Sequence, residues 1–285
     1  MKASIAPSPT PNPRAWRGSA ELVFAREGDR TLPIHICTRA PFKVQRSLYP
    51  EGSEICYATL VHTAGGMVGG DVLDQSIHLH AGSQVFLTTP AAGKIYRTMG
   101  EPCLQTATLR IEPGAYLEWL PQDAIAFNGA NYIQNIRVDL SPGGQILLWD
   151  IARLGRTARG EQLLQGEWRS QVEVWQEDLP LWIDHQFVRG GEAMTSSPHA
   201  LAGYPVMGTL ARVGRSFTDA EMEDLREAIA FVPPQYIGLT RSLNGLVCRY
   251  RGTSSQMARQ CFTRIWQRLR YFERGKMPDV PRVWR

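Results

Sequence analysis

Residues 77–87 (IHLHAGSQVFL), 109–119 (LRIEPGAYLEW) and 138–148 (VDLSPGGQILL) share one pattern. In each stretch apolar and polar residues alternate, an Ala-Gly or Pro-Gly turn follows, and a second apolar run begins. The turn glycines are 32 and then 29 residues apart. A period near 30 residues in strand-rich sequence is typical of coils that stack to bury their apolar faces. The pattern predicts a mainly β fold, either a β-helix or solenoid or a layered β body, although ordinary hairpins with Pro-Gly turns would imitate it.

The rest of the sequence divides the chain into three regions. Residues 1–17 contain four prolines among small residues, and we expect a flexible arm there. Residues 18–210 form the β-rich repeat body. Residues 211–285 are expected to form a small helical C-terminal part that packs on the same domain.

Two helices are predicted in that last region. Thr218 and Glu221 form a capping-box pattern, and Pro233 with Pro234 would stop the first helix. The second helix runs from about residue 254 to 273, with Thr253 and Gln256 as a possible capping box and Gly275 after its end. One face carries an apolar stripe made of Met257, Cys261, Ile265 and Leu269, widened by Phe262 and Trp266. This stripe favours core packing over a cofactor site.

The composition excludes several classes of protein. The chain has 285 residues, 43% hydrophobic and 20% charged, so it is neither disordered nor membrane-like. No apolar run is long enough for a transmembrane helix, and the N-terminus lacks the apolar stretch of a secretory signal. Five cysteines at long spacings without a CxxC pair argue against disulfides and favour the cytoplasm.

The positive charge is concentrated at the C-terminus. The chain carries +4 in total, but residues 249–285 hold ten basic and two acidic side chains. Such a segment fits an acidic partner surface, and equally a solvated helix face. We expect no nucleic-acid binding, because the rest of the chain is acidic and contains no recognised binding module.

The motifs show no catalytic chemistry. The glycine-rich residues 64–71 (AGGMVGGD) do not match a dinucleotide fingerprint, and residues 92–94 (AGK) lack the context of a P-loop. His78 and His80 lie two apart on a predicted strand, a spacing that suits zinc, nickel or copper. Two solvent-facing histidines are the simpler interpretation. Asp184-His185 has no activated serine beside it.

Several motifs, in order along residues 20–285, resemble the urease accessory protein family UreD, also called UreH. They are residues 62–71 (HTAGGMVGGD), 88–97 (TTPAAGKIYR), 117–122 (LEWLPQ), 127–130 (FNGA), Asp150, 155–161 (GRTARGE) and the ending at 266–270 and 281–284 (PRVW). Pro90 and Gly93 depart from the pattern, which has Gln at the first position and a larger residue or Thr at the second.

The resemblance implies a β-helix-like body with a small helical addition and no enzymatic activity. It also implies a scaffold or chaperone that delivers nickel to apo-urease together with UreF and, through UreF, the GTPase UreG. In that picture nickel is transient cargo that passes through the interior, and no cofactor is tightly bound.

A transit path must bind nickel weakly, so scattered oxygen ligands suit it better than cysteine or histidine cages. Candidates in the matching motifs are Asp71, Asp150, Glu161, Thr88 and Thr89. We expect some of them to face an internal path. Alternatively, Asp71 and Asp150 cap turns and Glu161 pairs with Arg156 or Arg159.

Partner binding is the second hypothesis. Arg264, Arg268 and Trp284 in the basic C-terminal segment would dock UreF or urease, with Trp284 as an aromatic anchor. The competing function is a carbohydrate-active β-helix enzyme, for which Asp123, Asp139 and Asp150 would have to cluster. No aromatic ladder or carboxylate-pair motif favours it.

Overall fold

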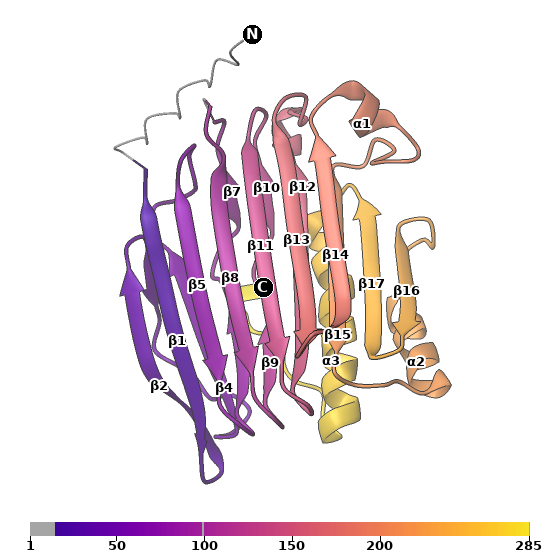
Figure 1. Cartoon of the computed structure of the whole chain (residues 1–285). Coiled ribbons are helices and arrows are strands. Elements are labelled where there is room, and N and C mark those ends of the chain that lie inside the picture. The colour runs from indigo at the N-terminus through magenta and orange to yellow at the C-terminus, as the bar shows by residue number, and fades with distance from the viewer. Residues whose placement is uncertain (1–14, 99, 285) are drawn as a thin grey trace.

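The computed structural model describes residues 15–98 and 100–284, and its strands form two sheets that lie face to face (Figure 1). The seven-stranded sheet contains β1 (Arg17–Glu27), β2 (Arg30–Arg39), β5 (Val72–Leu79), β8 (Cys103–Ile111), β11 (Asn131–Leu140), β13 (Glu167–Gln176) and β14 (Leu179–Arg189). Its spatial order is β14-β13-β11-β8-β5-β1-β2.

The ten-stranded sheet lies behind it in Figure 1. It contains β3 (Phe42–Val44), β4 (Ile55–His62), β6 (Gln84–Thr88), β7 (Gly93–Ile95), β9 (Tyr116–Trp119), β10 (Ala124–Ala126), β12 (Gln145–Leu154), β15 (Val206–Val213), β16 (Ile237–Ser242) and β17 (Gly245–Gly252). The main order is β16-β17-β15-β12-β9-β6-β4-β3, and β10 joins β12 to β7.

The predicted repeat is a β-solenoid. The chain alternates between the sheets, so that β5, β8 and β11 pair in parallel in one sheet while β6, β9 and β12 do so in the other. The turns that join them stack directly, since the Gly114 amide donates to the Gly143 carbonyl at 3.2 Å. Both glycines have positive φ, 70° and 80°, a backbone conformation that glycine adopts without steric cost. The 30-residue period therefore reflects coils of the fold.

The region after residue 190 is less helical than the sequence indicates. It contains β16 and β17, which the sequence analysis did not predict, as well as β15, which begins inside the predicted β body, and the short helix α1 (Glu192–Ser196). In β17 the residues Leu246, Cys248 and Tyr250 recur at period two and are buried, which is the pattern of a strand with one face on a core. Residues 211–285, expected to form a helical part, therefore contain two strands as well as the helices.

The two predicted helices are present. α2 (Asp219–Ile229) begins with the Thr218–Glu221 capping box, and α3 (Ser255–Arg274) ends at Gly275 in the left-handed conformation. The cap of α3 differs from the prediction, because Ser254 accepts the Met257 amide and Thr253 plays no part. Two short 3₁₀ turns cover Thr157–Arg159 and Arg282–Trp284.

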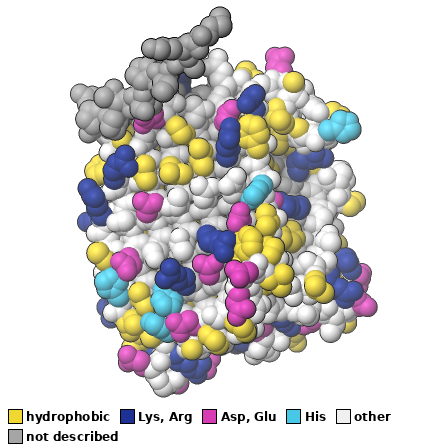
Figure 2. Space-filling view, in the orientation of Figure 1, with side chains coloured by type: hydrophobic (Ala, Val, Ile, Leu, Met, Phe, Trp, Pro, Cys, Tyr) yellow, Lys and Arg dark blue, Asp and Glu magenta, His cyan; other side chains and the backbone are white. Residues whose placement is uncertain are grey.

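Two apolar cores separate three layers. One core lies between the sheets, and the other lies between the ten-stranded sheet and the helices. In α3 the side chains of Cys261, Phe262, Ile265, Trp266 and Leu269 are fully buried in the second core, which confirms the stripe as core packing. The opposite face of the seven-stranded sheet is exposed and carries charges of both signs (Figure 2).

Three further predictions concern the cysteines, membrane-spanning helices and the N-terminal arm. All five cysteines are free thiols. Among the described residues, none of the helices combines the length and apolar character needed to cross a bilayer. Residues 1–14 of the expected arm lie outside the described residues, and Arg17 already belongs to β1.

Candidate functional site in the interior of the sandwich

A cavity of about 310 Å³ lies between the two sheets. Exposed residues line it, among them Gly65 in a loop and Lys94 in β7, so the cavity reaches the surface there. The two segments approach closely: a Cβ on Gly66 would lie 2.7 Å from the Lys94 carbonyl oxygen. The glycine-rich residues 64–71 thus form part of the cavity wall.

The deep end of the cavity is polar. Asp150 on β12 accepts hydrogen bonds from Nε2 of Gln134 at 3.0 Å and from Oγ of Ser170 at 2.9 Å. Burial raises the pKa of Asp150 to about 6, although the hydrogen bond from Ser170 opposes the shift; the charge of Asp184 raises it further. The carboxylate is therefore mostly ionised at neutral pH.

These side chains belong to a polar layer that crosses the sandwich. In the seven-stranded sheet the layer is a row of register partners on β8, β11, β13 and β14, namely Gln105, Gln134, Ser170 and Gln186. In the ten-stranded sheet it is a row on β12, β15 and β17, namely Asp150, Thr209 and Arg249.

The two rows are joined at the end remote from the cavity. Nε2 of Gln186 donates to Oγ1 of Thr209 at 2.9 Å, and Arg249 donates to both carboxylate oxygens of Asp184 at 2.8 Å. The Arg249 side chain is 48% exposed. The polar layer therefore leads from the cavity to the solvent at β17.

Two side-chain nitrogen atoms at the cavity lack a polar partner in the part of the chain that the structure describes. His62 and Gln75 both line the cavity, and their Nε2 atoms are buried without a hydrogen-bond partner among the described residues. Burial lowers the pKa of His62, and Asp71 only partly opposes this. A neutral imidazole with a free nitrogen is the form that binds metal ions.

The structure places the five proposed nickel ligands differently from one another. Asp150 and Thr89 line the cavity. Thr88 does not: its hydroxyl lies on the helix side of the sheet, where it donates to the Leu120 carbonyl at 2.6 Å and accepts from Nε1 of Trp284. Thr89 follows directly after the end of β6. Successive side chains of an extended chain face opposite ways, so Thr88 faces the helices and Thr89 the cavity.

Asp71 and Glu161 make the contacts expected of the alternative to nickel binding, in which Asp71 caps a turn and Glu161 forms an ion pair. Asp71 is buried and accepts the backbone amides of Trp16 at 2.7 Å and Val68 at 2.8 Å. Glu161 pairs with Arg156, which lowers the pKa of the carboxyl group, and it also accepts the Asn128 amide. Both carboxylates hold loops together. Asp150, by contrast, caps no turn.

The proposed docking residues are largely engaged within the chain. Trp284 is buried against the rings of Phe86, Trp149 and Trp266, so it is not an exposed anchor, and that expectation is wrong. Arg268 pairs with Asp224 of α2. Arg264 is exposed and lies over the Phe231 ring at 3.9 Å.

Sequence reasoning missed Gln134 and Ser170, which hold Asp150. A signal existed for the first of them. Along residues 134–140 the apolar phase of the strand is Ile136, Val138 and Leu140, and Gln134 interrupts it. A polar residue at an inward position of an otherwise apolar phase marks a buried polar contact.

Comparison with known proteins identifies the family of this chain. A family model described as UreD urease accessory protein matches residues 17–285. Curated proteins called urease accessory protein UreD include one from Nostoc sp., 46% identical over 95% of this chain and 96% of the relative. Others come from Thermosynechococcus vestitus, at 45% identity over 94% and 98%, and from Synechocystis sp., at 43% over 90% and 97%. The chain therefore belongs to the UreD family of urease accessory proteins.

Proposed function

We propose that this chain is a non-catalytic maturation factor of the cytoplasm that passes nickel through its interior to apo-urease. A role in urease maturation follows from family membership. The observation that carries the finer proposal is the polar layer, which connects an open cavity with the far edge of the sandwich and contains one ionised carboxylate, Asp150.

The chemistry of the layer suits transit rather than storage. Nickel binds imidazole and carboxylate groups, and a tight site of several such ligands would hold it. Here His62 stands near the surface loops, Asp150 lies deeper, and amide and hydroxyl groups follow. Each offers one ligand atom, so an ion would exchange between weak sites.

The partners are part of the same proposal. The chain acts with UreF and, through UreF, with UreG, and it hands nickel to the urease apoprotein. The nickel ion is cargo and no cofactor stays bound. Arg264 remains a candidate for partner docking because its side chain is exposed.

The competing proposal of a carbohydrate-active enzyme has less support. Glycoside hydrolysis needs two carboxyl groups on either side of one bond. Asp123 is buried and faces Arg259 of α3, Asp139 pairs with Arg137 on the outer face, and Asp150 lies between the sheets. The three carboxyl groups do not share one groove.

The test is the nickel content and activity of urease co-expressed with the other accessory proteins, with and without this chain. Urease should be nickel-poor without the chain and also with Asp150→Asn, which removes the charge but preserves the size of the side chain. Asp139→Asn, the same change on the outer face, should leave loading normal. Urease equally loaded without the chain would contradict the maturation role. Normal loading with Asp150→Asn would contradict the interior route alone.

A further inference from the structure

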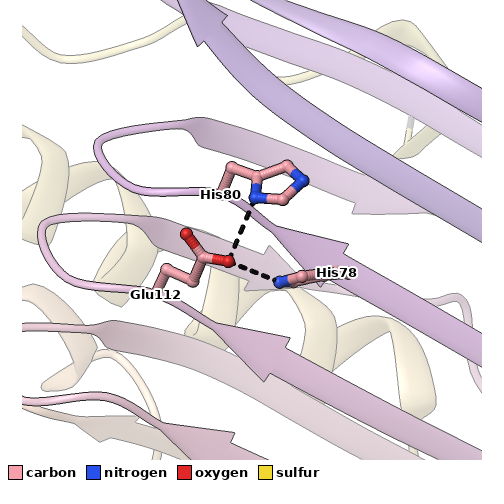
Figure 3. Close-up of side chains that lie close together, drawn as sticks. All are labelled: His78, His80 and Glu112. Atoms are coloured by element: carbon pink, nitrogen blue, oxygen red, sulfur yellow. Dashed lines mark hydrogen bonds and ion pairs between the residues drawn. The ribbon is translucent and has the colours of Figure 1, made fainter.

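Two histidines and a glutamate gather on the outer face of the seven-stranded sheet (Figure 3). Oε1 of Glu112 lies 2.8 Å from Nε2 of His78 and 3.0 Å from Nδ1 of His80. The two imidazole rings are 4.5 Å apart between centroids. All three ligand atoms lie within 4.8 Å of one another, and no other such group of three occurs among residues 15–98 and 100–284.

The solenoid repeat creates this cluster. His78 and His80 are two residues apart at the end of β5, so their side chains point to the same face. β8 pairs with β5 in parallel, with Leu79 opposite Ile111. His80 and Glu112 therefore occupy equivalent positions in successive coils, each directly before the Ala-Gly or Pro-Gly turn.

Hydrogen bonds fix the carboxylate in place. Oε2 of Glu112 accepts the Ala81 amide at 2.9 Å, which leaves Oε1 for the two rings. The Ala81 amide thus orients the carboxylate toward the two rings, as hydrogen bonds to ligand side chains do in metal sites.

The cluster is open to ions from solvent. The side chains of His78, His80 and Glu112 are 30%, 42% and 34% exposed. The nearest cation in register is Arg110, opposite His78, and it is exposed, so solvent screens its charge. All three side chains therefore keep part of their surface in contact with solvent.

We propose that His78, His80 and Glu112 bind one imidazole-preferring divalent cation, of the kind of nickel, zinc or copper. Two imidazole nitrogens and a carboxylate oxygen are ligands that such ions accept. Ligands about 2.1 Å from one ion lie roughly 3 Å or slightly more apart, close to the two nitrogen–oxygen separations present here. Three protein ligands leave coordination positions open, so the ion is exchangeable.

This site is separate from the interior route. Leu73, Gln75, Ile77 and Leu79 of β5 point inward, and His78 and His80 point outward. The proposal does not depend on the passage of nickel past Asp150, and either can fail without the other.

A matched control exists on the same sheet. His185 on β14 lies 3.2 Å from Glu173 on β13, and its side chain is 50% exposed. This pair has the same chemistry as the proposed site but only one imidazole. His185→Ala therefore reports what the loss of any surface histidine does.

The experiment titrates the full-length chain with NiCl₂ and, separately, ZnCl₂ by isothermal calorimetry. NMR spectra of the imidazole ring nitrogens locate the nickel by paramagnetic broadening. We expect one site that broadens His78 and His80, and an affinity at that site about tenfold or more lower in His78→Ala, His80→Ala and Glu112→Gln. His185→Ala should bind as the unaltered chain does, and circular dichroism should show all variants folded.

Two results would overturn the proposal. One is the absence of broadening at His78 and His80 when nickel is in excess. The other is an unchanged affinity and stoichiometry in the double variant His78→Gln and His80→Gln, which keeps polar side chains on the strand.

Discussion

The carboxylate of Asp150 accepts a hydrogen bond from Nε2 of Gln134 at 3.0 Å, and this contact joins the two sheets across the interior. Strands β11 and β12 are neighbours in sequence but belong to different sheets. The contact therefore lies inside one coil of the solenoid, at the deep end of the cavity. It places the carboxylate of Asp150 on the wall of the cavity between the sheets.

Gln134→Leu should block the interior route. Leucine has nearly the volume of glutamine but offers no ligand and no hydrogen bond to Asp150. We expect urease co-expressed with this variant to contain several-fold less nickel. Gln171→Leu makes the same change at an exposed position of β13 and should have no effect. Equal loading with both variants would show that nickel does not pass Gln134.

Asp150 should make stability depend on pH. Its pKa is raised in the folded chain to about 6, so the folded state holds the proton more tightly than the unfolded state. Below about pH 4 Asp150 is protonated in both states and does not lower the free energy of unfolding. The ionised carboxylate lowers that free energy increasingly as pH rises from about 4 to 6, and above this the loss stays constant at roughly 3 kcal/mol.

Urea unfolding of the unaltered chain and of Asp150→Asn between pH 4 and 8 measures this loss. The asparagine variant should gain stability relative to the unaltered chain over the range from pH 4 to 6. A difference that does not change with pH would mean that Asp150 titrates normally in the fold.

The buried ion pair between Glu118 and Arg270 should be essential for attachment of α3. Arg270 donates from Nε and Nη2 to the two carboxylate oxygens at 2.6 Å each, and both side chains are buried. Arg270→Met would leave Glu118 charged and unpaired, at a cost of about 3–5 kcal/mol.

Chemical denaturation would give the value, and Arg226→Met is the control. Arg226 forms an exposed pair with Glu223, which contributes about 1 kcal/mol at most. The double variant Arg270→Met and Glu118→Leu should recover much of the loss, because it removes both buried charges. A single variant as stable as the control would contradict this role.

A charge swap can separate packing from docking at Arg268. Arg268→Glu places a like charge beside Asp224 and should loosen α2 from α3, at a cost of about 1 kcal/mol. Adding Asp224→Arg restores the pair. If Arg268 serves only the packing of α2, UreF capture lost in the single variant returns in the double variant.

The complementary outcome assigns a docking role. Capture that stays weak in the stable double variant would mean that UreF contacts Arg268 directly. Arg264→Glu, at an exposed position one helical turn away, tests the same surface without breaking an ion pair between helices.

Local sequence determined the coils and the two helices. The repeated turns at Gly114 and Gly143 need a left-handed residue, and the alternating runs around them need a face to bury. The capping box at Thr218 and the apolar stripe of α3 are also local signals, and both are present. These features depend on residues within about one turn or strand of one another, so the sequence contains all the information they need.

Strand β17 has a local signal, the period-two Leu246, Cys248 and Tyr250, which the sequence analysis did not use. Strand β16 is shorter and lies at the side of the sheet, where it extends β17 and adds to the second core. The stability of both strands comes from neighbours distant in sequence, as is usual for strands at the side of a sheet.

The functional residues show the same division. Sequence motifs selected Asp71, Asp150 and Glu161 as equal candidates, and nothing local distinguishes them. The tertiary structure decided that Asp71 and Glu161 hold loops while Asp150 faces a cavity, because the partners of Asp150 arrive from β11 and β13. The sequence by itself determined the repeated strand–turn units and the outward His78–His80 pair. Only the packing of one sheet on the other decided which of the three carboxylates faces the cavity.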